Sequence, residues 1–374
     1  MLGSTFGVGL SRLSECFGGR MGLHDSRRFE FSTVLGVGIV ACVLLASSPT
    51  VAAKDRFDFG LRSDLALDYT DNLYRLSDDE LAAFDDLQGP TERFFDMSRS
   101  DDVIARFGLR GDLDWRLAKK RKVRLRLKGT YYGHAENTIA DYPRLEVTLS
   151  GDVTKKDKLY GGVDLIYDRF WKNLRVATTG VFAPAVYDQI DARVGYKRDL
   201  RKRWTAGLEY RHRTRTYEAP LGARDRDGDY LLGSTGYRVA HGVRGTSALQ
   251  YGDVTTETIV LPVSGILVDR SYQEWLAAQA FDFRLSKRVD LGLALQFRQR
   301  DYSTDDTRDE ARFERVDRRV RAAVSLALEL SRAWMLETRY RYTDNDSDRI
   351  DPTADSDQLG YTEHRFGVVL QYRT

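Results

Sequence analysis

Residues 103–117 read Val103-Ile-Ala-Arg-Phe-Gly-Leu-Arg-Gly-Asp-Leu-Asp-Trp-Arg-Leu117. Every second residue is apolar or glycine, and the residues between them are mostly charged or glycine. Successive side chains of a β-strand point to opposite faces, so this stretch predicts a strand with one apolar and one polar face. The same alternation recurs about fourteen times after residue 54. A closed barrel in a lipid bilayer has this pattern, with apolar side chains toward lipid and polar side chains toward the lumen.

The alternating segments are separated by turns and loops. The predicted strands are 56–70, 102–117, 123–135, 144–153, 159–168, 187–197, 204–216, 230–239, 244–252, 272–285, 289–300, 314–329, 334–343 and 364–373. A soluble all-β protein would instead have to hide every apolar face against another sheet. We therefore predict one all-β, antiparallel, up-and-down transmembrane β-barrel of about 14 strands over residues 54–374.

Long and short connections take turns along the predicted barrel. The long ones are near 71–101, 169–186, 217–229, 253–271, 301–313 and 344–363, and the short ones include 198–203. In outer-membrane barrels the short turns face the periplasm and the long loops face outward. Trp115, Trp204 and Trp334 come near short turns, whereas Tyr69 and Tyr131 come near long loops, which predicts an aromatic girdle at each interface. The predicted location is the cell outer membrane, in contact with its lipid and lipopolysaccharide.

The first 53 residues predict a cleaved signal peptide and presequence. Arg27-Arg28 precedes an apolar stretch at 31–46, and Val51-Ala-Ala53 offers a small-residue cleavage site. An N-terminal membrane anchor is the alternative. Both cysteines of the chain fall in this segment, so residues 54–374 have no thiol for disulfides, metal ligation or nucleophilic catalysis.

Arginine is frequent on the predicted lumenal face. By alternation, the lumen-lining candidates for an anion track are Arg110, Arg126, Arg211, Arg213, Arg215, Arg298, Arg300, Arg319, Arg321, Arg339 and Arg341. Guanidinium groups bind carboxylate and phosphate through two parallel hydrogen bonds, so such a ladder could guide an anionic oligosaccharide, a polysaccharide or a smaller anion. Acids such as Asp112, Asp191 and Glu337 are interleaved with the arginines. A structural Arg–carboxylate lattice is therefore the competing interpretation, and the two overlap.

The remaining polar residues predict no cofactor and no metal site. The net charge of +2 gives no indication of a nucleic-acid partner. The acidic loop at 344–351 lacks the glycine and glutamate positions of an EF-type calcium loop, so solvated acids facing lipopolysaccharide are the simpler interpretation. No His-Glu-x-x-His or Gly-x-Ser-x-Gly motif occurs, although His134 or His212 could serve as a base on a barrel enzyme. We expect no enzymatic activity.

Two segments resemble known outer-membrane proteins. Thr70-Asp71-Asn72-Leu73-Tyr74-Arg75 closes the first predicted strand and resembles a segment of outer-membrane β-barrel porins often encoded beside exopolysaccharide clusters. Asp71 and Asn72 also suit the tight exit from a strand, so a turn alone could explain them. The chain end 365–374 resembles the signal that outer-membrane barrels present to the barrel-assembly machinery, except that Arg373 and Thr374 follow where many such chains end in an aromatic residue. The resemblance of the chain end implies that the barrel-assembly machinery is a partner. The resemblance of residues 70–75 implies passage of a polysaccharide.

The predicted function is an outer-membrane channel for hydrophilic, anionic solutes or an acidic polysaccharide. A non-conducting structural or binding barrel is the alternative, and a barrel enzyme, a lipase or protease, is the third. About 14 strands lie between the small barrels filled by side chains and the 16–18-stranded porins with open channels, so we expect a narrow or occluded lumen.

Overall fold

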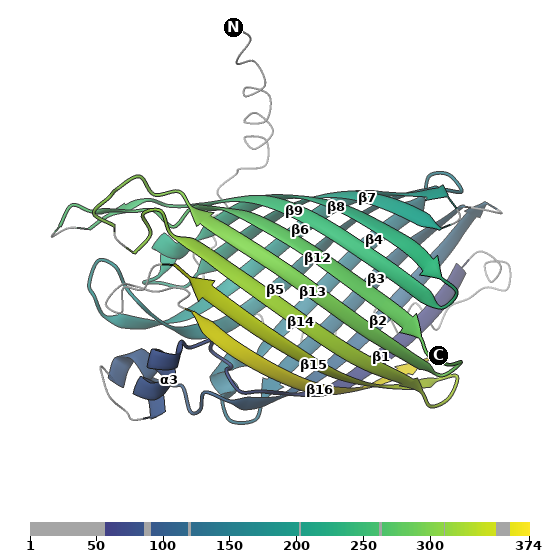
Figure 1. Cartoon of the computed structure of the whole chain (residues 1–374), viewed down its shortest axis with the longest axis horizontal. Helices are drawn as coiled ribbons and strands as arrows, with labels where there is room; N and C mark the ends of the chain where they lie inside the picture. The colour runs from purple at the N-terminus through teal and green to yellow at the C-terminus, as the bar shows by residue number, and fades with distance from the viewer. Residues whose placement is uncertain are drawn as a thin grey trace, which may run out of the picture. The chain divides into compact units, whose positions relative to one another are not determined.

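The computed structural model describes residues 57–85, 91–118, 121–201, 203–261, 264–309, 311–348 and 360–374. The signal peptide predicted for residues 1–53 lies outside these ranges. The described chain forms a closed barrel in which 14 strands pair in a ring, and Figure 1 shows them slanted across the barrel wall. All neighbouring pairs are antiparallel, which confirms the predicted fold.

Each barrel strand pairs with the next one along the chain, and the first strand pairs with the last. The barrel strands are β1 (Phe57–Thr70), β2 (Asp102–Ala118), β3 (Arg121–His134), β4 (Tyr142–Asp152), β5 (Asp157–Arg175), β6 (Phe182–Arg201), β7 (Trp204–Tyr217), β8 (Arg226–Ala240), β9 (Val243–Thr256), β12 (Tyr272–Arg284), β13 (Val289–Tyr302), β14 (Val316–Glu329), β15 (Trp334–Ser347) and β16 (Tyr361–Arg373). The connections hold the short strands β10 (Ile259–Val260) and β11 (Leu267–Val268), and the helices α3 (Asp78–Asp85), η1 (Thr91–Phe94), η2 (Thr138–Ala140) and η3 (Gly222–Arg224). No helix in these ranges is long and apolar enough to cross a membrane.

The two faces of the wall are those that the alternation predicts. On β2, Phe107 is 52% exposed on the outside, whereas Asp112 is 8% exposed on the inside. Trp115, Trp204 and Trp334 are exposed apolar residues near the ends of β2, β7 and β15. A barrel that turns its large apolar side chains outward needs lipid around it, because water would not solvate such a surface without cost.

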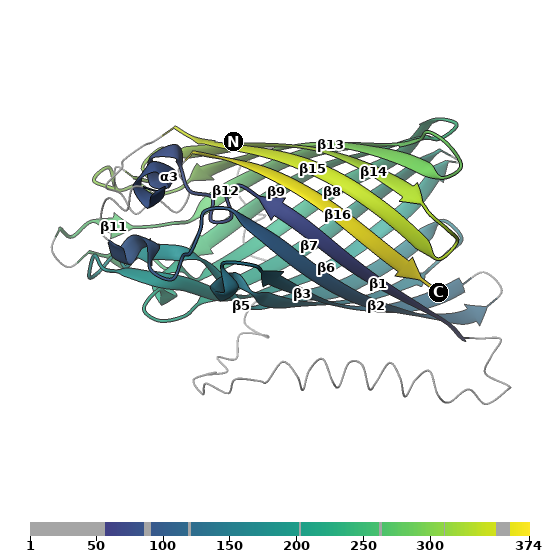
Figure 2. The same cartoon turned by 90° about the horizontal axis from the view of Figure 1, so that it is seen from below.

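The two ends of the barrel differ. Figures 1 and 2 place α3 and the C-terminus at opposite ends. The end with α3 and the long connections is called the outer end, and the end with the C-terminus and the short turns is called the periplasmic end, following the orientation of outer-membrane barrels.

The largest departure from the sequence prediction is the β5–β6 hairpin. Residues 169–186 were expected to form a long loop, but β5 continues to Arg175 and β6 starts at Phe182. The pairing of β5 with β6 shifts register after Ile166 and again after Phe170. Bulges of this kind break the two-residue period that identifies a strand, so the alternation could not reveal this part of β5. The turn expected at 198–203 is likewise mostly strand, since β6 runs to Arg201.

The connections at the outer end pack into small apolar cores of their own. Tyr74, Leu76 and Met97 from the β1–β2 connection bury against Phe170 of β5 and Ala140 of η2. A second cluster joins the β5–β6 hairpin to Tyr217 and Leu221 around β7. The described parts of the 71–101 connection are therefore packed against the β5–β6 hairpin.

Candidate functional site

A cavity of about 300 Å³ lies inside the outer end of the barrel. Nine arginines line it: Arg75, Arg169, Arg213, Arg215, Arg226, Arg298, Arg300, Arg319 and Arg321. Five tyrosines line it as well: Tyr74, Tyr142, Tyr187, Tyr230 and Tyr272. In the part of the chain that the structure describes, no Asp or Glu belongs to this lining. The site is called the arginine cavity below.

Tyrosine rings support four of these arginines. The distances from guanidinium carbon to ring centroid are 4.3 Å for Arg215 and Tyr187, 4.5 Å for Arg300 and Tyr272, 4.7 Å for Arg169 and Tyr142, and 5.1 Å for Arg213 and Tyr230. A cation over an aromatic face is attracted to the ring quadrupole without being neutralised. The rings therefore orient the guanidinium groups and leave their positive charge in place.

The arginines of the cavity differ in how they are compensated. Arg213 donates to Asp191 at 2.7 Å and Arg300 donates to Glu274 at 2.8 Å, both behind the lining. Arg215 instead donates to the neutral amide oxygen of Gln189 at 2.8 Å. Among the described residues, Arg169, Arg215, Arg319 and Arg321 form no ion pair with a carboxylate. The cavity thus keeps a positive potential, which narrow low-dielectric walls strengthen.

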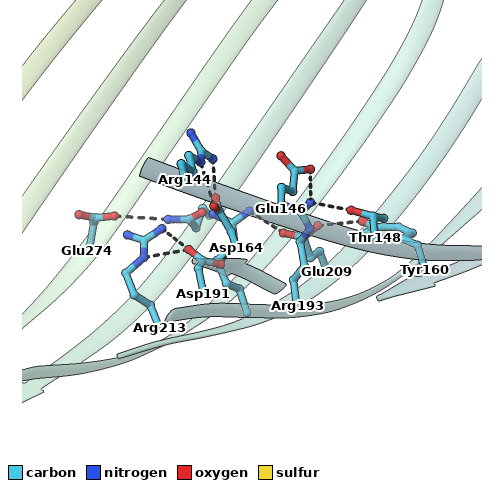
Figure 3. Close-up of polar contacts among 12 residues, drawn as sticks. Arg144, Glu146, Thr148, Tyr160, Asp164, Asp191, Arg193, Glu209, Arg213 and Glu274 are labelled. Carbon is cyan, nitrogen blue, oxygen red and sulfur yellow. Dashed lines mark hydrogen bonds and ion pairs between the residues drawn. The ribbon is translucent and has the colours of Figure 1, made fainter. Parts of the chain in front are cut away.

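The wall nearer the middle of the barrel is different, because its arginines are paired. Figure 3 shows Arg144 directed at Asp164, and it also shows Arg213, which lines the arginine cavity, directed at Asp191. Arg193 donates to Glu146 at 2.9 Å in the same close-up. Such arginine–carboxylate pairs along the wall, within one strand or between strands, are called the wall lattice below. Arginine–carboxylate hydrogen bonds between strands rigidify the wall.

The eleven arginines predicted to form an anion track separate into these two environments. Six line the arginine cavity: Arg213, Arg215, Arg298, Arg300, Arg319 and Arg321. Four belong to the wall lattice, with partners within 2.9 Å: Arg126 with Asp112, Arg211 with Glu209, Arg339 with Asp68, and Arg341 with Glu363. Arg110 bonds Asp112 at 2.7 Å and also lines a second cavity. The structure therefore does not place all eleven on one continuous track.

The second cavity, of about 240 Å³, lies nearer the periplasmic end of the barrel than the arginine cavity does. It is also basic, because Arg62, Arg110, Lys128 and Arg373 line it, but Asp64 belongs to the same lining. Arg62 and Arg373 face each other across the β1–β16 seam. Positive charge therefore occurs at two levels of the lumen and is least compensated at the outer one.

Three arginines of the arginine cavity were absent from the eleven that were predicted to form an anion track. Arg169 follows the first bulge of β5, which turns its side chain inward against the strict alternation. Arg226 begins β8 inside the predicted loop 217–229. Arg75 lies beyond the end of β1, in the segment that resembles the porin family. None of the three could be assigned to the lumen by counting from a predicted strand.

The turn after β1 places Arg75 in the lumen. The buried Asn72 side chain accepts from the Leu76 amide at 2.8 Å and donates to the Leu76 carbonyl at 2.7 Å. Arg75 adopts a left-handed backbone with φ of 56°, which is uncommon for a residue with a side chain. Its guanidinium lies 3.8 Å from Glu363. The polar residues after β1 therefore close a turn, as expected, and that turn also carries an arginine into the cavity.

The 71–101 connection is fixed by a buried ion cluster of Glu80, Lys172 and Arg93, called the Glu80 latch. Glu80 accepts from the Ser77 amide at 2.9 Å, and the Glu80 amide donates to the Ser77 hydroxyl at 3.2 Å, which is a capping box at the start of α3. Lys172 of β5 lies 3.4 Å from Glu80. Burial by itself would raise the pKa of Glu80, but Lys172 and Arg93 outweigh it and hold the pKa below its ordinary 4.5.

The two histidines considered as bases occupy different settings. His134 is buried beside Asp141, at 3.1 Å, and lines the arginine cavity. His212 lies on the outward row of β7, 2.9 Å from Asp229 and 3.3 Å from the Thr214 hydroxyl. That hydroxyl donates to Asp227 at 2.8 Å, so its proton is directed away from the imidazole. This geometry does not activate a nucleophile.

No group of three or more His, Cys, Asp or Glu side chains in the described ranges could hold a metal ion. The chemistry that the arginine cavity offers is donation to, and charge compensation of, an anion.

No protein-family model and no curated protein matches the chain in sequence. Among solved structures, the chain is similar to a bacterial polysaccharide outer membrane secretin at 8% identity and a TM-score of 0.45, over 83% of this chain and 98% of that one. It is also similar to an anion-selective porin from Comamonas acidovorans at 12% identity and a TM-score of 0.43, over 85% and 99%. A third is OmpT, an outer membrane protein of Vibrio cholerae, at 9% identity and a TM-score of 0.44, over 86% and 100%. Such likenesses carry no information on what this chain does.

The closed barrel and its apolar outer surface define the class of protein. The chain is a transmembrane β-barrel located in the cell outer membrane.

Proposed function

We propose that this barrel is a channel for hydrophilic anions, with the arginine cavity as its selective element. The observation that carries the proposal is the lining of that cavity, which has nine arginines and, within the described chain, no acid. A cation entering there meets several uncompensated guanidinium groups, whereas an anion is stabilised by them. In this proposal the protein works by electrostatic selection, and the Thr214 hydroxyl beside His212 donates to Asp227 instead of to the imidazole.

The selectivity test is a reversal potential in a planar bilayer under a potassium chloride gradient. The wild type should prefer chloride at low salt, and the preference should fade as salt screens the lumen. Replacing Arg215, Arg319 and Arg321, which line the cavity and form no ion pair with a carboxylate, together with Gln should reduce the preference while the barrel still folds. Preference for cations would contradict the proposal. A wild type without conductance would leave a non-conducting binding barrel, and lipase and protease assays test the enzyme alternative directly.

An acidic polysaccharide is the narrower version of the same proposal. A cavity of about 300 Å³ is at the small end of ligand pockets, so it accepts about one sugar unit at a time. Passage of a chain would then require the docked 71–101 connection to move, because Leu73, Tyr74 and Arg75 line the cavity. A charged oligosaccharide should interrupt the chloride current in discrete events, whereas a neutral one of equal length should not.

The proposed partners follow from the outer surface of the barrel and from its C-terminal strand. The exposed apolar wall takes outer-membrane lipid, and the acidic outer connections face lipopolysaccharide. The C-terminal segment 365–374 forms β16 with its end at the periplasmic side, where the barrel-assembly machinery would recognise it. A crosslink between an introduced photoreactive group at Gln371 and that machinery during assembly is the corresponding measurement.

A further inference from the structure

Unpartnered polar atoms gather at the arginine cavity. Several buried side-chain atoms of its lining have no hydrogen-bond partner among the described residues, and four of these atoms are the Tyr74 hydroxyl, Trp171 Nε1, Arg319 Nε and Arg321 Nε. They come from three separate segments, namely the 71–101 connection, β5 and β14. Buried polar groups are nearly always hydrogen-bonded, so a cluster of exceptions around one cavity calls for a missing partner.

These atoms share one property, which is that all of them can donate. Trp171 Nε1 and the two guanidinium nitrogens are donors only. Burial raises the pKa of Tyr74, so its hydroxyl keeps its proton and can donate too. The buried oxygens without a hydrogen bond, on Asp191, Gln296, Thr343 and Glu363, belong to residues outside this lining. The missing partner must therefore be rich in acceptors.

The charges set the second requirement. Arg319 interacts electrostatically with Arg321, Arg75 and Arg300, all of like charge, while the one carboxylate among the described residues that interacts with both Arg75 and Arg321 is that of Glu363, which lies outside the lining. Tyr74 is only 1% exposed, which shows how little water reaches that part of the lining. Like charges held this close in a dry site are destabilising unless an anion lies between them. A singly charged ion such as chloride would compensate one guanidinium but offers no set of directed acceptors.

We propose that the Tyr74, Trp171, Arg319 and Arg321 side chains form a saturable binding site for a multiply charged oxyanion, completed by Arg75 when the 71–101 connection is docked. The inference rests on the proposed anion channel and narrows it from a general preference for anions to one bound oxyanion. Two sources share this chemistry: a small free oxyanion such as a diphosphate, and the carboxylates of an acidic glycan. Both present several oxygens to several donors.

Binding is measured by calorimetry on the purified full chain in non-ionic detergent, with no current involved. The probes are inorganic pyrophosphate and trigalacturonate, titrated without divalent cations. At least one of them should bind with one-to-one saturation. Arg319→Gln should weaken the binding of that probe about ten-fold, and Tyr74→Phe should weaken it about three-fold. These changes are those expected for the loss of a charged and of a neutral hydrogen bond. Tyr74→Phe removes one oxygen and keeps the ring, so its apolar packing in the 71–101 connection is preserved.

The matched control is Arg110→Gln, which removes a lumenal arginine outside the arginine cavity. Affinity within two-fold of the wild type is expected for it. Equal loss in Arg110→Gln and Arg319→Gln would reduce the site to a diffuse field and overturn the proposal, as would the absence of saturation with both probes. Binding of pyrophosphate alone assigns the site to a free oxyanion, and binding of trigalacturonate alone assigns it to a glycan. Saturable binding by a barrel that shows no conductance would contradict the proposed channel function and support the proposed oxyanion site.

Discussion

The arginine cavity and the wall lattice are built from the same sequence pattern and differ in what faces each arginine. Arg126 of β3 lies directly across from Asp112 of β2 and bonds it at 2.8 Å. Arg319 of β14 lies across from Arg298 on one side and Asn345 on the other. The positions of the arginines along one strand therefore do not by themselves determine the role of each arginine. The register with the neighbouring strand decides whether a guanidinium stiffens the wall or is left for a ligand.

The largest effect is expected from breaking the lattice. Asp191 lies 3.4 Å from Arg211 and 2.7 Å from Arg213 and is almost fully buried. Asp191→Asn leaves both guanidinium groups without this carboxylate, so the free energy of unfolding should fall by about 3 kcal/mol. Urea unfolding in detergent micelles, followed by the heat-modifiable mobility of the barrel, measures it. A loss below about 1 kcal/mol would mean that the lattice is solvated and contributes as little as a surface ion pair.

A smaller and local effect is expected at the connection that closes the arginine cavity. Glu80→Gln leaves Lys172 buried without its carboxylate, which should cost about 2 kcal/mol of local stability. Amide exchange of residues 77–85 should accelerate, while exchange in β2 and β3 should not change. Equal acceleration in both places would show that the latch holds the whole barrel and not this connection alone.

The same latch gives a pH dependence with a definite sign. The folded-state pKa of Glu80 lies below its ordinary 4.5, so its contribution is complete above that value and is lost as the pH falls through the folded pKa. Acid should therefore lower the protection of amides 77–85 in the wild type, measured as exchange rates corrected for the intrinsic pH dependence of amide exchange. Glu80→Gln should show low protection at every pH, and a persisting acid response of the protection would assign the switch to another carboxyl.

The smallest expected change in the free energy of unfolding is a stabilisation, whereas Asp191→Asn is expected to destabilise the barrel. Arg319→Gln removes one like charge from the arginine cavity, so the unliganded barrel should become more stable by up to about 1 kcal/mol at low ionic strength. The gain should shrink as salt screens the repulsion. Arg126→Gln is the control from the wall lattice, and it should destabilise. Loss of stability in both variants would erase the distinction between the two regions.

The architecture was predictable because a strand in a bilayer carries its own signature. The period of two over residues 103–117 is enough to orient β2, and repetition around the ring gives the strands and their faces. The site was only partly predictable. Arg319 and Arg321 follow from the alternation, but their freedom from carboxylates depends on Asn345 and Thr343 across the register.

What escaped prediction lies where the period fails. Arg169 follows a bulge, and Arg75 follows a turn that Asn72 fixes through side-chain hydrogen bonds. The Glu80 latch joins residues 92 positions apart, Glu80 and Lys172, and no local pattern connects them. Contacts of this kind follow from the closed fold and leave no trace in the sequence around either residue.

The seam between β1 and β16 has a consequence for the kinetics of folding. Leu61 donates its amide to the Thr374 hydroxyl across 313 positions of the chain. Closing so long a loop is the slowest kind of contact to form, because chain entropy must be lost before the pairing returns any energy. Every hairpin along the ring is local, so the sheet can grow strand by strand while its two edges stay open. We expect the joining of those edges to be the last step, because it requires β16, the last barrel strand along the described chain.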